Sequence, residues 1–475
     1  MAGSSITFYE RVEDALHDQQ LQTALNISTS RFTNGRKAAL QALPEADALR
    51  DHARRIRAHT IAHLDRYLGQ FADSVEQAGG QVHWAETADE ANRIVATLAQ
   101  ERNVKNVVKS KSMISEELHL NAVLEAARIC VTETDLGEYI AQLAEEKPSH
   151  IIAPVIHKTR QDVADLFRQK LGATDEDLSD VPHMTALARR VLRNAFLQAD
   201  MGISGVNFAV AETGSICLVT NEGNGRLTTT TPRIHVALMG MERLVPKFED
   251  LGVMLQILAR SATGQKTSVY TNIVTGPRRA GNNDSGEPDG PDELHVVIID
   301  NGRSQILGSE LAEILYCIRC GACLNACPVY QQIGGHAYNS VYPGPVGLVV
   351  TPGLYGINPW SELPHASTLC GACREVCPVR INIPRMLLKL RDEATKAGHY
   401  PGWLKRGLSL YRQAATRPTM YHKGAQVSAW LSQRLSRSGW INKLPGSLSG
   451  WTDSRDFPAL AKKSFSQRWR EERDE

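Results

Sequence analysis

Seven of the nine cysteines in this 475-residue chain lie between Cys317 and Cys377, and this clustering constrains the fold more than any other feature. The other two, Cys130 and Cys217, are isolated in the sequence. The N-terminus lacks the basic region and apolar run of a secretory signal, so we expect the protein to stay in the cytoplasm. Clustered thiols in a cytoplasmic protein indicate metal binding rather than disulfides.

The clustered cysteines form two groups, and each group ends in the dipeptide Cys-Pro. The first group has the spacing C-x2-C-x2-C-x3-C-P and comprises Cys317, Cys320, Cys323 and Cys327. The second has the spacing C-x2-C-x3-C-P and comprises Cys370, Cys373 and Cys377. Thiolates are soft, anionic donors that bind iron strongly. In two-cluster ferredoxins, the last cysteine of such a group ligates the other cluster.

Crossed ligation of this kind predicts two 4Fe-4S clusters. The ligands assigned to cluster one are Cys317, Cys320, Cys323 and Cys377. Cluster two is assigned Cys327, Cys370, Cys373 and a fourth ligand. The spacing of the first group places this ligand at position 367, where the chain has Ser367. Three solutions are open: an alkoxide from Ser367, a substitute group such as His365, or a three-iron (3Fe-4S) cluster.

Zinc is the alternative metal for a cysteine-rich segment. Zinc ribbons use two Cys pairs that are separated by roughly 12–20 residues, with about four ligands for each ion. Seven cysteines in triplet spacing, with a Cys-Pro at the end of each group, fit that pattern poorly. The spacing therefore favours iron–sulfur clusters.

The chain before the cysteines divides into two parts. Residues 1–80 are expected to be helical, because apolar residues between Leu49 and Val75 recur at spacings of three and four. From 81 to 305, strands alternate with helices, which indicates an α/β domain. Strands are expected at 104–108, 129–134, 235–240 and 294–300, helices at 116–127 and 183–200, and a hairpin from 206–210 and 216–220. Residues 150–156 form another apolar run, and 281–291 are rich in turn residues.

The remaining chain also divides into two parts. Residues 306–395 hold the cysteine groups, with irregular chain expected between them. Residues 396–475 are expected to be helical and carry five of the seven Trp. From residue 381 onward there are 18 Lys or Arg against 8 Asp or Glu. We expect this basic tail to pack against the chain's own acidic surface or a partner, with peripheral contact to anionic lipid as a second interpretation.

Composition excludes several classes of function. The whole chain has 53 Lys or Arg against 52 Asp or Glu, so no global field favours nucleic acid. The sequence contains no stretch of 18 apolar residues, so no transmembrane segment is predicted. Neither a dinucleotide-binding glycine motif nor a P-loop occurs.

Several strings match a known family together with the cysteine groups. They are Lys109-Ser-Lys-Ser112, Glu133-Thr-Asp-Leu-Gly-Glu-Tyr139, Asn207-Phe-Ala-Val-Ala-Glu-Thr-Gly-Ser215, Thr220-Asn-Glu-Gly-Asn224, Met239-Gly-Met-Glu-Arg243, the Gly-Gly-His336 stretch and the Tyr342-Pro-Gly-Pro stretch. The chain resembles the lactate utilization protein B family, the iron–sulfur subunit of the L-lactate utilization complex. The likeness covers nearly the whole length and is weakest in the first 40 and last 60 residues.

The resemblance implies a lactate-utilization domain with a fold like ribose-5-phosphate isomerase and CoA transferases, followed by an α-helical, two-cluster ferredoxin-like domain. It also implies two 4Fe-4S clusters and conversion of L-lactate to pyruvate. Two partner subunits are implied, a Cys-rich redox subunit and a second subunit with a lactate-utilization domain. All seven cysteines that ligate clusters in the family have matches here.

We therefore interpret the chain as an electron-transfer subunit of an oxidoreductase complex. Lactate gives up two electrons, whereas a cubane accepts one at a time, so the substrate carbon needs another group, such as a flavin, on this chain or a partner. Two alternatives are open: a complex that oxidises another 2-hydroxy acid such as glycolate, or a non-catalytic iron–sulfur sensor or scaffold. No catalytic residue is assigned from the sequence.

Outside the cysteine groups, five residues receive a functional or a structural interpretation. Lys109 and Lys111 follow a predicted strand. In one interpretation they bind a carboxylate or phosphate at the carboxyl edge of the sheet, and in the other they belong to a solvated loop. Glu212 resembles the glutamate nucleophile of CoA transferases, but a structural turn is the simpler interpretation. Cys130 and Cys217 lie in strand patterns, and we expect both to be buried packing residues.

Overall fold

The computed structural model describes residues 7–174, 177–278, 290–399, 402–453 and 455–474, and it divides into two units, Met1–Ala397 and Gly398–Glu475. Most of the turn-rich stretch at 281–291 lies outside the described residues.

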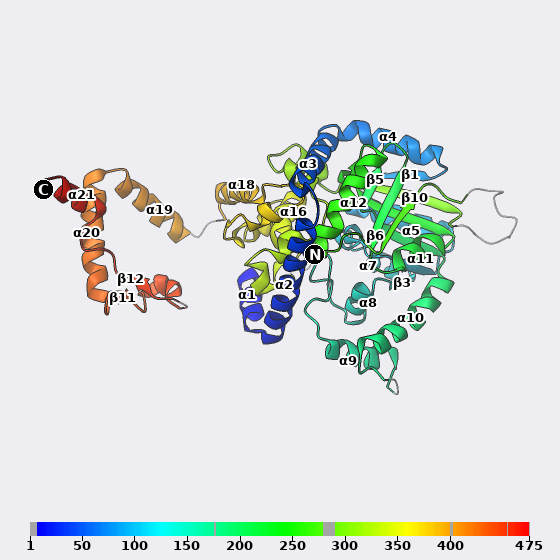
Figure 1. The fold of residues 1–475 in the computed structure, drawn as a ribbon, viewed down its shortest axis with the longest axis horizontal. Coiled ribbons are helices and arrows are strands. Elements are labelled where there is room, and N and C mark those ends of the chain that lie inside the picture. The colour runs from blue at the N-terminus through cyan, green and yellow to red at the C-terminus, as the bar shows by residue number, and fades with distance from the viewer. Residues whose placement is uncertain (1–6, 175–176, 279–289, 400–401, 454, 475) are drawn as a thin grey trace. The chain divides into compact units, whose positions relative to one another are not determined.

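A six-stranded parallel sheet forms the centre of the first unit (Figure 1). Its strand order is β1-β10-β7-β4-β2-β3, and every neighbouring pair is parallel. The strands are β1 (Gln81–Ala85), β2 (Asn106–Lys109), β3 (Cys130–Glu133), β4 (Met201–Gly205), β7 (Ile234–Gly240) and β10 (Glu293–Ile299). The central strands β7 and β10 are largely apolar and almost fully buried, because both faces of a parallel sheet are covered. The expected α/β architecture is confirmed.

Alternate residues of the central strands pack on opposite faces of this sheet. Val297 and Ile299 face a core formed with α5 (Ala88–Glu101) and α7 (Leu120–Ala126). Val296 and Ile298 belong to the other core, which includes the second sheet and α12 (Phe248–Ala262). The sheet is therefore a buried layer between helices and a second sheet.

The second sheet has the strand order β8-β5-β6-β9. Its strands are β5 (Phe208–Val210), β6 (Ser215–Thr220), β8 (Leu244–Val245) and β9 (Tyr270–Val274). Strands β5 and β6 pair antiparallel across the Gly-containing turn, which confirms the predicted hairpin.

The other helices of the α/β part lie between its strands or after the last of them. They are α6 (Met113–Glu117), α8 (Leu136–Leu143), α9 (Arg160–Leu171), α10 (Val181–Gln198), α11 (Asn224–Thr230), the short η1 (Met241–Arg243) and α13 (Arg303–Leu307). The single helix expected at 116–127 is wrong, because His119 adopts a left-handed φ of 54° and separates α6 from α7. The apolar run at 150–156 forms no strand; its backbone consists of bends and turns.

Four helices precede the sheet, as expected for residues 1–80. They are α1 (Phe8–His17), α2 (Gln19–Gln41), α3 (Ala46–Ala62) and α4 (Leu64–Gln77). Helix α2 packs against α12 of the α/β part and also against helices of the cysteine region (Figure 1). The N-terminal helices therefore join the two parts.

The cysteine region is built from short helices. They are η2 (Ala312–Tyr316), α14 (Ala322–Asn325), α15 (Tyr330–Ile333), η3 (His336–Tyr338), α16 (Gly344–Tyr355), η4 (Asn358–Trp360), η5 (Leu363–His365), α17 (Ala372–Val376) and α18 (Ile383–Lys396). The chain between the cysteine groups was expected to be irregular, but α16 lies within it. The Pro in the first turn of α16 favours a helix start, which the string of Gly and Pro concealed.

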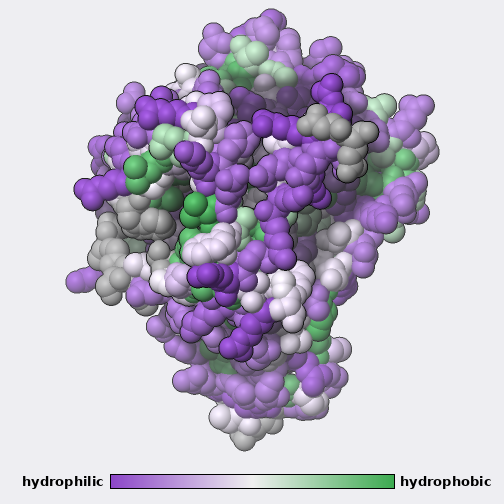
Figure 2. All heavy atoms as spheres, turned by 90° about the vertical axis from the view of Figure 1, so that its left-hand side faces the viewer, coloured by the Kyte–Doolittle hydropathy of each residue, from purple (hydrophilic) through white to green (hydrophobic). Residues whose placement is uncertain are grey.

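The second unit is helical with one two-stranded sheet. Its elements are α19 (Gly402–Ala415), α20 (Pro418–Leu435), β11 (Trp440–Ile441), η6 (Gly446–Trp451), β12 (Phe457–Pro458) and α21 (Phe465–Asp474). Trp430, Trp440, Trp451 and Trp469 are exposed. The view in Figure 2 shows a mostly hydrophilic surface with apolar side chains in small, separate patches. Among the described residues, no helix is long and apolar enough to cross a membrane.

Arg57 of α3 is the best single test of the packing between the N-terminal helices and the rest. Its guanidinium is 1% exposed and donates to the carbonyls of Tyr316 at 3.3 Å and Leu315 at 2.8 Å, and to those of Leu244 and Glu242. We expect Arg57→Ala to lower the free energy of unfolding by about 3 kcal/mol, because buried carbonyls lose their donor. Denaturant unfolding measures this.

The matched control is Arg55→Ala, since Arg55 lies two residues away on the exposed side of the same helix. Its effect should stay below about 0.5 kcal/mol. Equal losses in the two variants would contradict the packing described.

Candidate iron–sulfur centres and the adjoining cavity

The four cysteines assigned to cluster one lie together. Cys317, Cys320, Cys323 and Cys377 line one small cavity, with apolar walls from Ile318, Val346 and Ile383 among others. Cys317 follows η2, Cys323 lies in α14, and Cys377 ends α17. The last cysteine of the second group therefore meets the first three cysteines of the first group.

The three cysteines assigned to cluster two also influence one another. Burial raises the pKa of Cys373 to about 12, and the neighbouring thiolates of Cys327 and Cys370 contribute to this rise. Cys327 and Cys373 are buried, whereas Cys370 is exposed. The ligands assigned to cluster two therefore reach the surface at Cys370.

Ser367 occupies the position that corresponds to Cys317. In the first loop, Arg319 and Gly321 have positive φ values of 57° and 74°, and in the second loop Leu369 and Gly371 have 56° and 86°. The N–H of Arg319 donates to the Cys317 sulfur at 3.4 Å, and the N–H of Leu369 donates to the Ser367 hydroxyl at 3.2 Å. The two loops thus share a backbone conformation.

The chemistry of these sulfurs fits iron–sulfur ligation. All nine cysteines are free. The backbone N–H of Ala322 donates to Cys320 and that of Ala372 to Cys370, and such donors stabilise thiolates. Burial raises the pKa of Cys377 to about 11. A group of buried thiols becomes stable as thiolates when a metal supplies positive charge, so the residues present fit 4Fe-4S clusters.

Arginines of the N-terminal helices hold the backbone beside Cys377. Arg36 donates to the carbonyl of Val376 at 2.7 Å, and Arg50 donates to that of Cys377 at 2.9 Å. Arg54 donates to the carbonyl of Arg380 at 2.7 Å. These contacts fix the loop and add positive charge around it.

A buried ionic network connects the α/β part to the cysteine region. Arg303 pairs with Glu117 at 2.8 Å and with Glu242 at 2.7 Å, and the Tyr342 hydroxyl donates to Glu117 at 2.6 Å. Burial would raise the pKa of Glu242, but Arg303, Arg243 and Arg319 lower it to about 2. The network is therefore ionised at neutral pH.

Gly240 makes room for the Arg303–Glu242 pair. A Cβ atom there would lie 2.2 Å from a Glu242 oxygen and 2.5 Å from the Arg303 Nε. No larger side chain fits without moving the pair. The Met-Gly-Met-Glu-Arg string thus has a structural reason for its glycine.

A cavity of about 600 Å³ lies at the carboxyl edge of the parallel sheet. Its lining comes from segments that follow β2, β3, β4 and β7: Ser110 to Ile114, Asp135, Val206 and Asn207, and Arg243. Lys111 lines it and donates to the Ile152 carbonyl at 2.9 Å. Lys111 thus lies at the carboxyl edge of the sheet, as its anion-binding interpretation requires, and anion binding stays a prediction.

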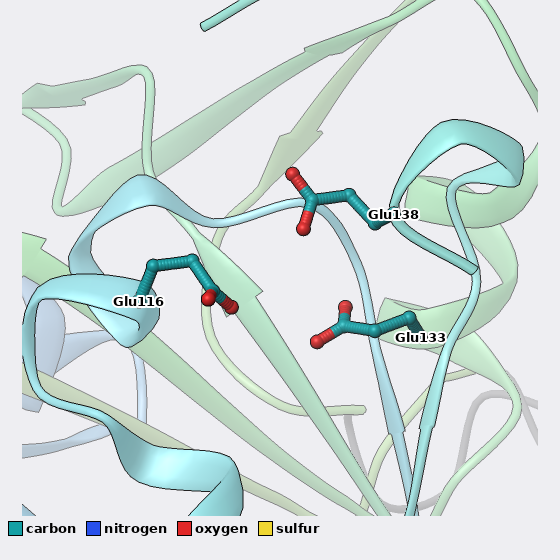
Figure 3. A group of neighbouring side chains, drawn as sticks. All are labelled: Glu116, Glu133 and Glu138. Carbon is teal, nitrogen blue, oxygen red and sulfur yellow. The ribbon is translucent and has the colours of Figure 1, made fainter. Parts of the chain in front are cut away.

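Lys109 does not reach this cavity. Its ammonium is 1% exposed and lies 2.6 Å from Glu133 and 3.0 Å from Glu116. Glu116, Glu133 and Glu138 converge from α6, β3 and α8, with their oxygens within 4.8 Å of one another (Figure 3). Burial, and then the charge of Glu133, raises the pKa of Glu138 to about 8. Lys109 is therefore the buried cation of this group, and both interpretations given for it are wrong.

Other expectations have mixed outcomes. Cys217 is buried, as expected, but Cys130 is exposed because it begins an edge strand. Glu212 accepts a hydrogen bond from the Phe248 N–H at 3.0 Å at the start of α12, which favours the structural interpretation. Sequence reasoning gave no role to Arg243 or Arg303. Arg243 ends the Met239-Gly-Met-Glu-Arg243 string, which is the signal that could have marked it, whereas no such string contains Arg303.

Comparisons with known proteins place these features in a family. Residues 68–299 match the LUD domain, residues 313–381 the 4Fe-4S dicluster domain, and residues 404–474 the C-terminal region of lactate utilisation protein B. "Lactate utilization protein B" of Bacillus pumilus is 45% identical over 96% of this chain and 96% of its own. The protein of the same name from Geobacillus sp. is 45% identical over 98% of this chain and 97% of its own.

A crystal structure of a DUF162 family protein from Deinococcus radiodurans aligns with 50% of this chain and 98% of its own. Its sequence identity is 14% and its TM-score is 0.26, which is too low to carry an argument.

The α/β sheet, the two cysteine groups and the matching domains define a class of iron–sulfur proteins in which a LUD domain precedes a 4Fe-4S dicluster domain. Identity over nearly the full length then fixes the family. The chain belongs to the lactate utilization protein B family.

The raised pKa of Glu138 predicts a pH-dependent stability. The carboxyl has a pKa of about 8 when folded, against 4.5 for an exposed glutamate. Between these values the folded state holds a proton that the unfolded state releases, so stability falls as the pH rises through this window. We expect Glu138 to contribute about 1 kcal/mol or more of stability at about pH 6 that is lost by about pH 8.5.

Glu138→Gln should remove this loss, because an amide does not titrate. Denaturant unfolding at both pH values measures the difference, and Glu125→Gln, at an exposed position of α7, is the matched control. Parallel pH profiles for the wild type and Glu138→Gln would contradict the assignment.

Proposed function

We propose that this chain is the iron–sulfur electron-transfer subunit of an oxidoreductase complex that converts L-lactate to pyruvate. The relatives named above are called lactate utilization protein B, and they match this chain from end to end. The 4Fe-4S dicluster match covers both cysteine groups. Family and domain together support a redox role in lactate metabolism.

The observation that carries this proposal is the placement of the cysteines. Four of them line one cavity, and three others influence one another, which supports the crossed arrangement of two-cluster ferredoxins. When bound there, two 4Fe-4S clusters would supply one-electron transfer. We assign Cys317, Cys320, Cys323 and Cys377 to the first and Cys327, Cys370 and Cys373 to the second.

The residues of this chain set the environment of the two sites. The first is enclosed by apolar side chains and by the guanidinium of Arg319, which is 8% exposed. The second has one exposed ligand, Cys370, so it is the natural point of exchange with a partner. We propose a Cys-rich redox subunit and a second subunit with a lactate-utilization domain as the partners.

The C-terminal unit supports an assembly role. Its exposed Trp residues and its excess of basic side chains are typical of interfaces. Peripheral contact with an anionic membrane is the second candidate for this surface. Free thiols throughout the chain support a place in the reducing cytoplasm.

Two finer structural proposals accompany the function. We propose that the lactate-utilization domain spans residues 81–305 and the cluster domain 306–395. We also propose that the former shares the fold of ribose-5-phosphate isomerase and CoA transferases. The parallel sheet with a cavity at its carboxyl edge supports this relation.

Two other functions are separated from this one by simple measurements. A complex for another 2-hydroxy acid would oxidise glycolate faster than lactate. A sensor or scaffold would assemble clusters that lactate does not reduce. Rapid cluster reduction by lactate in the complete complex excludes the sensor.

Cys320→Ser tests the proposed role of cluster one. We expect the variant to lose about four irons per chain and to stop lactate-driven electron flow in the complete complex, because a buried ligand is missing. Iron analysis, EPR of the reduced protein and a lactate oxidation assay measure this. Cys130→Ser, at an exposed and isolated cysteine, should behave as the wild type. Unchanged EPR and activity in Cys320→Ser would refute the assignment.

Ser367 is our proposal for the fourth ligand of cluster two. It accepts the same backbone hydrogen bond that Cys317 accepts, and Arg391 holds its carbonyl at 2.7 Å. We expect Ser367→Ala to lose about one iron per chain and to show the EPR signal of a three-iron cluster. Ser367→Cys should keep all of its iron but shift the EPR spectrum of cluster two.

Identical iron content and EPR spectra in the wild type and Ser367→Ala would contradict this ligand. His365→Ala is the control, because it tests whether the imidazole of His365 is the ligand in place of the Ser367 hydroxyl. Loss of iron in His365→Ala alone would assign the position to His365.

A further inference from the structure

The cavity at the sheet edge adjoins the site assigned to cluster one. Arg319 and Ile151 line both the large cavity and the small one that contains the four cysteines. Arg319 stands between Cys317 and Cys320 in the chain. The end of the large cavity nearest the cysteines therefore shares these two side chains with the small cavity.

The same end of the cavity is rich in guanidinium groups. Arg243, Arg303 and Arg319 all line it. Arg303 is saturated by its bonds to Glu117 and Glu242. Arg243 and Arg319 only approach a Glu242 oxygen, at 3.8 Å and 3.6 Å, which is too far for hydrogen bonds.

Two of these guanidinium groups have donors to spare. Within the described part of the chain, Arg243 donates no hydrogen bond, and Nε and Nη1 of Arg319 are buried without an acceptor. Arg243 is 13% exposed, so a ligand in the cavity can reach it. A planar guanidinium matches a carboxylate through paired N–H donors.

The acidic residues of the cavity lie on other segments and are already engaged. Asp135 accepts from the N–H of Gly137 at the start of α8, and Glu222 accepts from the N–H of Leu136. Met113, Ile152 and Leu258 add apolar wall. Small-molecule sites combine such walls with a few charged groups.

We propose that this cavity binds a small organic carboxylate, a 2-hydroxy or 2-oxo acid, through Arg243 of the α/β domain and Arg319 of the cysteine region, so that the ligand lies beside the site assigned to cluster one. The choice of acid rests on the proposed function, whereas the carboxylate site rests on the geometry. The ligand's negative charge lies next to the Cys317–Cys320 loop, so its binding alters the EPR spectrum of reduced cluster one.

The experiment uses the full chain with its clusters, prepared without air and reduced chemically. The probe is oxamate, an unreactive carboxylate analogue of pyruvate, with inorganic phosphate and a flavin mononucleotide as comparison ligands. Calorimetry measures binding, and EPR measures the change at cluster one. We expect oxamate to bind and to shift the EPR spectrum.

Arg243→Gln should weaken oxamate binding at least about tenfold. Arg243→Lys keeps the charge and should bind with intermediate affinity, which keeps the test valid if the Gln variant does not load its clusters. Arg189→Gln, at an exposed position of α10 outside the cavity, is the matched control and should bind as the wild type.

Two results would overturn the proposal: equal oxamate affinity in Arg243→Gln and Arg189→Gln, or a spectral shift with phosphate or flavin mononucleotide but not with oxamate. The test needs no turnover, so it is independent of the proposed function. If oxamate binds but lactate reduces no cluster in the complete complex, the function fails and the site stands. If lactate reduces the clusters but oxamate does not bind, the substrate site lies on a partner.

Discussion

The buried contacts of Arg303 with Glu117 and Glu242 hold the functional half of the molecule together. Glu117 ends a short helix at the edge of the sheet, Glu242 follows a central strand, and Tyr342 comes from the chain between the two cysteine groups. Loss of one partner from such a buried network leaves an uncompensated charge, at a cost of about 3–5 kcal/mol. The network therefore fixes the cysteine region against the sheet edge, where the cavity lies.

This attachment has a consequence for electron flow. The loop of Cys317 and Cys320 forms a wall of the cavity through Arg319, while the second cysteine group reaches the surface at Cys370. A bound acid, a buried cluster and an exposed cluster would thus follow one another from the sheet edge outward. The arrangement gives the α/β domain a reason to be joined to a dicluster domain in one chain.

The sequence predicts the parts of this arrangement that are local. Cysteine spacing groups the ligands because three of them lie in one loop. Apolar runs predict β2, β3, β7 and β10 because both sheet faces are buried, whereas β1 and β4 were missed because polar residues or Gly interrupt them. The network could not be predicted, since Glu117 and Arg303 are 186 residues apart. Lys109 was misjudged for the same reason: the carboxylate of Glu133 comes from a neighbouring strand, and only the fold places it beside the lysine.

The central claim is that the seven clustered thiols hold two iron–sulfur clusters. Iron, zinc and acid-labile sulfide analysis of the chain, purified without air, tests this most directly. The account predicts brown protein with about eight irons and equal sulfide per chain. Colourless protein that contains zinc and no sulfide would contradict it.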